Sequence, residues 1–131
     1  YNTIGSIYAD QGKYQWALDN FNKATGADPG LDEAYFNQGA VLYNMTFYER
    51  AIKMFMKVLE VIPDDWEAFF YLGKASGYLR KWDDSLNYLE KAYRLNPNEP
   101  LITFELGVIH RFLGHRNQAS LYFLATQKLV K

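Results

Sequence analysis

Apolar residues recur along this chain with the spacing of an α-helix, and the whole pattern returns every 34 residues. The bulky apolar position shows the step clearly, at Phe21, Phe55, Leu89 and Phe123. A fixed interval of this length indicates one structural unit stacked several times. Polar and helix-breaking residues separate the apolar segments, and no stretch has the alternation of a β-strand. The pattern therefore predicts an all-α chain.

Short connections between the apolar segments predict eight helices, each antiparallel to its neighbours. Pro29, Pro63 and Pro97 keep the 34-residue step, and each should end the second helix of a unit. The expected helices are residues 1–11, 14–28, 31–45, 48–62, 65–79, 82–96, 99–113 and 116–130.

Residues that occupy the same position in successive 34-residue repeats form a column. Small residues form two such columns. The first column is Gly5, Gly39, Gly73 and Gly107, and the second, twelve residues later, is Ala17, Ala51, Ser85 and Ala119. A glycine inside a helix costs about 1 kcal/mol relative to alanine, so close approach of a neighbouring helix is expected. We expect the two columns to face each other and to let the helices of a pair pack tightly.

The turns inside the units carry their own signals. Gly12 and Gly114 occupy equivalent places between the two helices of a unit. Thr46 and Glu49 have the Ser/Thr-x-x-Glu spacing of a capping box, which predicts a helix start there.

These columns resemble the tetratricopeptide repeat family. The motifs are Tyr1-x-x-Ile4-Gly5-x-x-Tyr8, Tyr35-x-x-Gln38-Gly39-x-x-Leu42, Phe69-x-x-Leu72-Gly73-x-x-Ser76 and Thr103-x-x-Leu106-Gly107-x-x-His110. Gln38, Ser76, Thr103 and His110 stand where the family typically has bulky apolar residues. The resemblance covers the whole chain as four repeats, the first lacking its start, at about residues 1–31, 32–65, 66–99 and 100–131. It implies a single domain, residues 1–131, folded as a right-handed superhelical α-solenoid.

Composition and charge fit such a domain. Hydrophobic residues make up 49% and charged residues 22%, and the aromatic share of 18% is high enough to leave rings for a binding surface. Residues 1–65 carry nine acidic and five basic residues, whereas residues 66–131 carry six acidic and nine basic ones. Neither half has a basic run and the net charge is −1, so we expect no nucleic-acid partner. No stretch approaches the roughly 20 apolar residues of a membrane span.

Candidate catalytic groups are sparse. Cysteine is absent, and His110 and His115 are five residues apart, a spacing that does not share a helix face. The Asp pairs at residues 64–65 and 83–84 fall at expected helix starts, where they should cap free N–H groups and complement the helix dipole. No phosphate-binding loop or nucleophile–base signature is present. We therefore expect no catalysis, no metal and no cofactor.

The resemblance implies that the first helices of the repeats line a concave groove, and helix periodicity indicates which side chains face it. The candidate partner-binding residues are Glu33, Phe36, Asn37, Tyr43, Glu67, Phe70, Tyr71, Lys74, Tyr78, Phe104, Glu105, Val108, Arg111 and Phe112. Two interpretations stay open. Phe36, Phe70 and Phe104, which keep the 34-residue step, either complete the packing between first helices or belong to an apolar trough for a peptide. The trough would be completed by Tyr43, Tyr71, Tyr78 and Phe112.

The charges of the groove suggest which peptide it would take. The glutamates would give the trough an acidic rim, which favours a partner with apolar anchors and a basic residue. Asn37 stands at the central Asn of the clamp with which one subgroup of the family captures C-terminal carboxylates. The flanking places here hold no cations, so we do not expect that clamp.

The resulting hypothesis is a non-catalytic protein-interaction module, part of a larger scaffold or adaptor. A chaperone-like holder of an apolar client segment and a non-catalytic arm of a larger enzyme are the alternatives. The chain opens inside an expected helix, so we expect it to be a piece of a longer protein. Leu121, Leu124 and Leu129 on the last helix have no following unit to cover them. Either more chain follows, or copies of the chain associate end to end.

Overall fold

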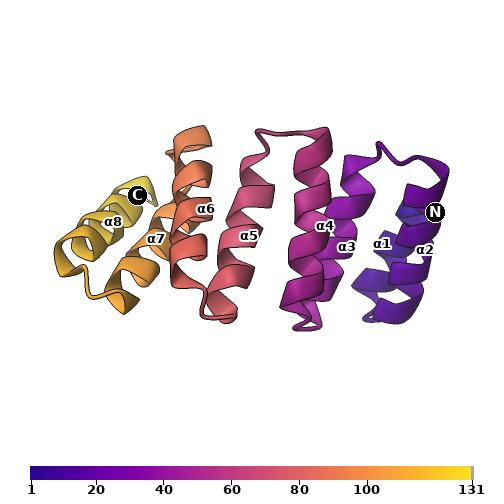
Figure 1. Ribbon diagram of the computed structural model, residues 1–131, viewed down its shortest axis with the longest axis horizontal. Helices are drawn as coiled ribbons and strands as arrows, with labels where there is room; N and C mark the ends of the chain where they lie inside the picture. Colours follow the sequence, from indigo (N-terminus) through magenta and orange to yellow (C-terminus); the bar gives the residue numbers. More distant parts are fainter. Residues whose placement is uncertain (131) are drawn as a thin grey trace. The chain divides into compact units, whose positions relative to one another are not determined.

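The helices lie where the sequence pattern places them. The computed structural model describes residues 1–130, which contain eight α-helices and no strand (Figure 1). The helices are α1 (Asn2–Asp10), α2 (Tyr14–Ala27), α3 (Asp32–Asn44), α4 (Tyr48–Val61), α5 (Trp66–Tyr78), α6 (Trp82–Leu95), α7 (Pro100–Phe112) and α8 (Arg116–Leu129). Every bound lies within one residue of the predicted one, so the helix prediction is confirmed. Lys131, the last residue of the predicted domain, lies outside the described residues.

The chain forms two compact units, Tyr1–Pro63 and Asp64–Lys131. Each unit contains two antiparallel helix pairs, α1–α2 with α3–α4 in the first and α5–α6 with α7–α8 in the second (Figure 1). Within a unit, the second helix of one pair packs against the first helix of the next, as α2 does on α3 and α6 on α7. The first helices also touch, α1 with α3 and α5 with α7. The predicted fold class, an all-α solenoid of helix pairs, is confirmed.

The glycine column accommodates a bulky side chain. A Cβ on Gly39 would lie 2.8 Å from Cζ of Phe55, closer than real Cβ contacts allow. In the other repeats, an added Cβ would be equally close to the corresponding side chain: Gly5 to Phe21, Gly73 to Leu89 and Gly107 to Phe123. The expected approach of a small residue twelve positions later is seen at Gly73, where the backbone oxygen of Ser85 would lie 3.3 Å from the added Cβ. The side chain sixteen positions later fills the space that a Cβ would need.

The turn inside each repeat needs a left-handed residue. Gly12 and Gly114 take φ values of 74° and 81°, and Thr46 and Arg80 hold the same place in the other two repeats at 67° and 60°. Glycine adopts this conformation freely, whereas an L-residue with a side chain pays roughly 1–2 kcal/mol. Thr46 is consequently a turn residue. The spacing of Thr46 and Glu49 predicted a helix start here, and α4 does begin at Tyr48, but its N-cap is Phe47 and the side-chain hydrogen bond of a capping box is not formed.

The two Asp pairs differ in their role. Asp65 is the N-cap of α5, and its side chain accepts a hydrogen bond of 3.1 Å from the backbone N–H of Glu67. The pair at residues 83–84 lies in the first turn of α6, whose N-cap is Lys81. The capping interpretation is thus confirmed for Asp65, while the other pair can only complement the helix dipole.

Polar residues at apolar columns are buried, and most find partners. Gln38 donates a hydrogen bond of 2.6 Å from Nε2 to Asn22, and Thr103 shares one of 2.7 Å with Thr126. Oε1 of Gln38 is the exception, because within residues 1–130 it is buried without a hydrogen-bond partner. None of the helices in this part of the chain is long and apolar enough to cross a membrane.

Candidate partner-binding site

A pocket of ≈ 640 Å³ opens in the second unit, between α5, α7 and the start of α6. Five predicted partner-binding residues line it: Lys74, Tyr78, Glu105, Val108 and Phe112. Arg80 and Trp82 also line it, although the sequence analysis did not select them. Both lie outside the first helices, Arg80 in the turn and Trp82 at the start of α6, and only first-helix positions were considered.

Small residues form the floor of the pocket. Gly73 and Gly77 lie one turn apart on α5, next to Ser85 of α6. The Ser85 hydroxyl is fully buried and donates a hydrogen bond of 2.7 Å to the backbone carbonyl of Gly73. A Cβ on Gly77 would be in ordinary van der Waals contact with Oγ of Ser85, at 3.4 Å. The Ser85 hydroxyl at the floor is thus already hydrogen-bonded within the fold.

Aromatic rings form the mouth of the pocket. Phe112, the last residue of α7, is 67% exposed and stacks on Trp82 with ring centroids 5.1 Å apart and planes 12° apart. Tyr78, the last residue of α5, is 59% exposed and lines the same pocket. Because Tyr78 and Phe112 stand 34 residues apart, they occupy the same place in successive repeats. The repeat thus delivers two large exposed rings to one opening.

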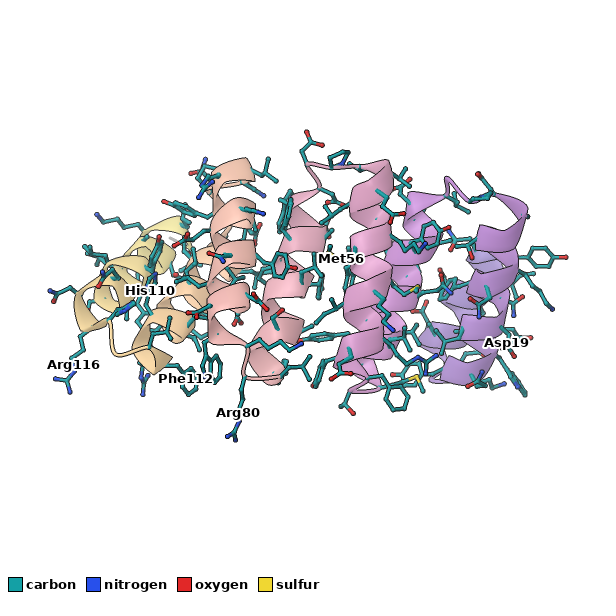
Figure 2. The ribbon with its side chains drawn as sticks, in the orientation of Figure 1. Asp19, Met56, Arg80, His110, Phe112 and Arg116 are labelled. Atoms are coloured by element: carbon teal, nitrogen blue, oxygen red, sulfur yellow. The ribbon has the colours of Figure 1, made fainter. Side chains whose placement is uncertain are left out.

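Charged side chains are distributed unevenly around this pocket. Nζ of Lys74 lies 3.9 Å from Oε1 of Glu105, and both side chains are mostly buried. Burial raises the pKa of Glu105, and Lys74 opposes that shift. Arg80 is exposed and forms no ion pair within residues 1–130; Figure 2 shows it extending away from the helices at the same end of the unit as Phe112. The pocket therefore has one internally neutralised pair and one outward-facing cation.

The first unit has a pocket at the equivalent place, but with different chemistry. Its volume is ≈ 220 Å³, and eight of its lining residues stand 68 positions before lining residues of the larger pocket. Asp10 and Asn44 take the places of Tyr78 and Phe112, and Gly12 takes the place of Arg80 in the adjoining turn. The larger volume and the rings of Tyr78 and Phe112 are thus properties of the second unit, and the repeat architecture alone does not produce them.

The other predicted residues of the second unit have mixed surroundings. Phe70 is only 5% exposed and belongs to the hydrophobic core, so its ring offers almost no surface to a partner. Tyr71 is half-buried with its ring edge on Phe70, at a centroid distance of 5.3 Å. Phe104 is 48% exposed and contacts the ring of Phe123.

Two charged predicted residues of this unit lie at its surface. Glu67 and Arg111 are both exposed. Burial, with Asp65 and then Glu99 nearby, raises the pKa of Glu67. Neither residue lines the pocket.

Predicted residues of the first unit mostly take part in internal packing. Phe36 meets the buried ring of Phe55 edge-on at 5.4 Å, and Tyr43 meets Tyr48 in the same way at 5.5 Å. Glu33 is exposed in the first turn of α3.

Asn37 belongs to a polar network in the first unit. Its side-chain amide donates to Oδ1 of Asn2 at 3.0 Å and to Oγ of Ser6 at 3.4 Å. Both acceptors are uncharged side chains on α1, and Asn37 and Ser6 line the smaller pocket.

The two histidines meet, which the sequence analysis did not foresee. Nδ1 of His110 lies 3.0 Å from Nδ1 of His115, and the His110 ring stacks on Tyr122. His110 lies near the end of α7 and His115 is the N-cap of α8, so the turn brings them together. A five-residue spacing that crosses a predicted turn was the available signal. Within residues 1–130 no group of three or more potential ligands could hold a metal ion.

Comparison with known proteins identifies the family. Models of the tetratricopeptide repeat match residues 1–31, 32–65 and 66–99. The chain belongs to the tetratricopeptide repeat family. Solved structures agree: MamA from Desulfovibrio magneticus RS-1 has a TM-score of 0.91 and 26% identity, covering 98% of this chain and 72% of that one. Tetratricopeptide repeats are generally non-catalytic interaction modules, so the chain is assigned to protein–protein interaction.

Curated relatives are much longer than this chain. The human protein O-mannosyl-transferase TMTC1 is 24% identical over 115 residues, which are 85% of this chain and 13% of that protein. The type IV pilus assembly protein PilF of Pseudomonas aeruginosa is 28% identical over 105 residues, or 79% of this chain and 42% of PilF. The anaphase-promoting complex subunit 3 of Schizosaccharomyces pombe is 28% identical over 126 residues, or 84% of this chain and 19% of that subunit. Their names span a transferase, an assembly factor and a subunit of a large complex.

Proposed function

We propose that this tetratricopeptide repeat chain holds a peptide segment of a partner protein on the α5–α7 face of its second unit. The observation that carries the proposal is the aromatic opening of the ≈ 640 Å³ pocket, formed by Tyr78 and Phe112. Pockets that bind ligands typically enclose about 300–1,000 Å³, so this one can receive a bulky side chain. Exposed rings bury a large area on binding and lose little conformational entropy, which is why they dominate interface hot spots.

The proposed surface is narrower than the groove expected from the sequence. It consists of the pocket residues together with Tyr71 and Phe104 on the adjoining helix faces. Phe70 is left out because its burial assigns it to the core. Phe36 and Asn37 are left out because they belong to the first unit, where Phe36 packs on the buried ring of Phe55 and Asn37 is hydrogen-bonded to Asn2.

A double variant, Tyr78→Asn with Phe112→Asn, tests the proposal. Asn44 shows that the fold accepts asparagine at this place in a repeat, so the helical circular dichroism should stay unchanged. Peptides selected from a displayed random library on the wild-type chain should bind the variant roughly 10- to 100-fold more weakly. A matched control is Trp16→Ala with Phe47→Ala, which removes two exposed rings of the first unit. Unchanged affinity of the asparagine variant would rule out this surface.

The two alternative roles make different predictions for the same selection. A chaperone-like holder would enrich apolar peptides with no preferred sequence, whereas an interaction module would enrich a defined motif. A non-catalytic arm of an enzyme would bind in the same way but within a longer protein, and one relative, named as a transferase, is matched over only 13% of its length. The sequence of the full-length protein distinguishes that case.

Self-association is a second proposal, favoured by the last helix. Leu121 and Leu124 of α8 are 66% and 48% exposed, and Ile4 and Ile7 of α1 are 48% and 50% exposed. Exposed apolar faces such as these on α8 and α1 can bind to each other between two copies of the chain. Sedimentation across a wide concentration range tests this: a monomer throughout would exclude it, and Leu121→Lys should dissolve any oligomer that forms.

A further inference from the structure

We propose that the pocket of the second unit recognises a bulky apolar side chain with an Asp or Glu next to it in the partner peptide, and that Arg80 binds this carboxylate. The inference rests on the proposed function and adds the chemistry of the partner. It also reverses the expectation from the sequence that the partner carries a basic residue.

The first support is the charge that a partner would meet at the pocket. The lining contains three charged side chains, and two of them, Lys74 and Glu105, lie within 3.9 Å of each other. Glu105 is thereby neutralised by its neighbour and attracts a basic partner only weakly. Arg80 remains without an ion pair in the described part of the chain, and Asp83 and Asp84 on the adjacent turn of α6 do not line the pocket. The complementary group is therefore a carboxylate, which an arginine can bind through two parallel N–H donors.

The second support is the backbone at Arg80. With φ at 60°, this residue stands in the left-handed region, where a glycine would be free of strain. Repeats one and four have glycine at the same place, Gly12 and Gly114. The Arg80 side chain does not offset this backbone strain within the fold, since the side chain is exposed and makes no hydrogen bond or ion pair within residues 1–130. Binding a partner would explain why arginine, and not glycine, occupies this position.

The third support is the comparison between the two units. The smaller pocket of the first unit lacks both features at once, because Gly12 replaces Arg80 and Asp10 and Asn44 replace the two rings. The cation and the aromatic opening therefore occur together in the one unit that has the larger pocket. An apolar anchor and an adjacent carboxylate would use both features together.

The experiment is a selection from a displayed random dodecamer library on the whole 131-residue chain, followed by affinity measurements on one enriched peptide and its Glu→Gln or Asp→Asn form. The chain is used as wild type and as Arg80→Gly, Arg80→Gln and the asparagine double variant at positions 78 and 112. Thr46→Gly is the matched control, because it relieves the same backbone strain in the first unit. Thermal melting of each variant accompanies the binding data.

The wild type should enrich peptides with an aromatic or long aliphatic residue within two positions of an acidic one. Neutralising the peptide carboxylate should weaken its binding to the wild type roughly 5-fold. The same change in the peptide should not alter its affinity for Arg80→Gly or Arg80→Gln. Arg80→Gly and Thr46→Gly should both melt at a higher temperature, whereas only the former should lose the acidic preference. Enrichment of basic or neutral residues beside the anchor, or a preference that survives in both Arg80 variants, would overturn the inference and leave the peptide-binding proposal standing. Binding that the asparagine double variant does not weaken would overturn the proposed function itself.

Discussion

Cζ of Phe55 lies 2.8 Å from the point where a Cβ on Gly39 would sit, and the Phe55 ring is fully buried. The two residues belong to the two helices of one pair, so the glycine sets how closely α3 and α4 approach. A methyl group at Gly39 has no room unless the ring moves, and a fully buried ring cannot move without disturbing its neighbours.

Gly39→Ala should therefore destabilise the fold by about 1–3 kcal/mol, the usual cost of overpacking a core. Urea denaturation followed by circular dichroism measures this loss. The control is Gly26→Ala, since nothing lies within 4 Å of its added Cβ and the position is in a helix. The control should gain up to about 1 kcal/mol from helix propensity. If Gly39→Ala matched the wild type, the close contact with Phe55 would not constrain the pair.

Thr46→Gly should stabilise the protein because Thr46 holds a left-handed φ of 67° in an exposed turn. Removing that strain is worth about 1 kcal/mol, less the extra entropy that glycine gives the unfolded chain. The converse change, Gly12→Ala, places a side chain at a φ of 74° and should cost a similar amount. Opposite shifts in the urea midpoint are expected, and shifts of the same sign would refute the strain account.

Gln38→Leu should also stabilise the fold, by about 1 kcal/mol. The Gln38 side chain is 4% exposed, and its Oε1 has no hydrogen-bond partner among the described residues. A buried polar atom left unpaired costs roughly 1–3 kcal/mol, and leucine removes it. The equivalent places in the next two repeats hold Leu72 and Leu106, both fully buried, so leucine suits the position. Asn22 loses its partner but is exposed and can bond to water.

A smaller stability in Gln38→Leu would mean that its hydrogen bond to Asn22, at 2.6 Å, outweighs the orphaned oxygen. Asn22→Ala separates the effect of the hydrogen bond from that of the unpaired Oε1, since it removes the bond and keeps Gln38. It should be clearly destabilising only if that bond matters.

The fold could be predicted from the sequence because one period controls every local signal. Prolines, turn glycines and apolar columns repeat in phase, so an error in one repeat is corrected by the other three. The incorrect predictions concern residues whose local sequence fits two different structures. At these positions the surrounding residues determine which structure forms. Thr46 fits a capping box by spacing, yet two of the three residues at the same place in the other repeats are glycines, Gly12 and Gly114, and these indicate a turn.

The candidate site was harder to predict because exposure does not follow the period. Phe36, Phe70 and Phe104 keep the 34-residue step, but they are half-buried, buried and about half-exposed, respectively. The charge of the pocket depends on the pairing of Lys74 with Glu105, which joins different repeats and leaves no mark on the sequence. Arg80 was missed because turn residues were considered only for their backbone.

Acidification should weaken the fold through His110. Its ring is 6% exposed, its Nδ1 contacts that of His115 on α8, and it stacks on Tyr122 of the same helix. Burial lowers the pKa of His110, the neighbouring His115 lowers it further, and Glu90 on α6 opposes the shift. In the unfolded chain the same imidazole titrates near the ordinary value of 6.5. Between the folded and the unfolded pKa the unfolded chain binds more protons, so the free energy of unfolding falls as the pH drops below about 6.5.

His110→Phe keeps a planar ring beside Tyr122 and removes the titrating group. Urea melts at about pH 7.5 and about pH 5.5 should show a smaller loss of stability in this variant than in the wild type. The comparison between variants matters because Glu67 and Glu105, whose pKa values are raised, change stability in the opposite direction on acidification. Their contribution is common to both proteins and cancels in the difference. Equal losses in the two proteins would mean that His110 takes up its proton as easily folded as unfolded, and that its contact with His115 does not favour the neutral ring.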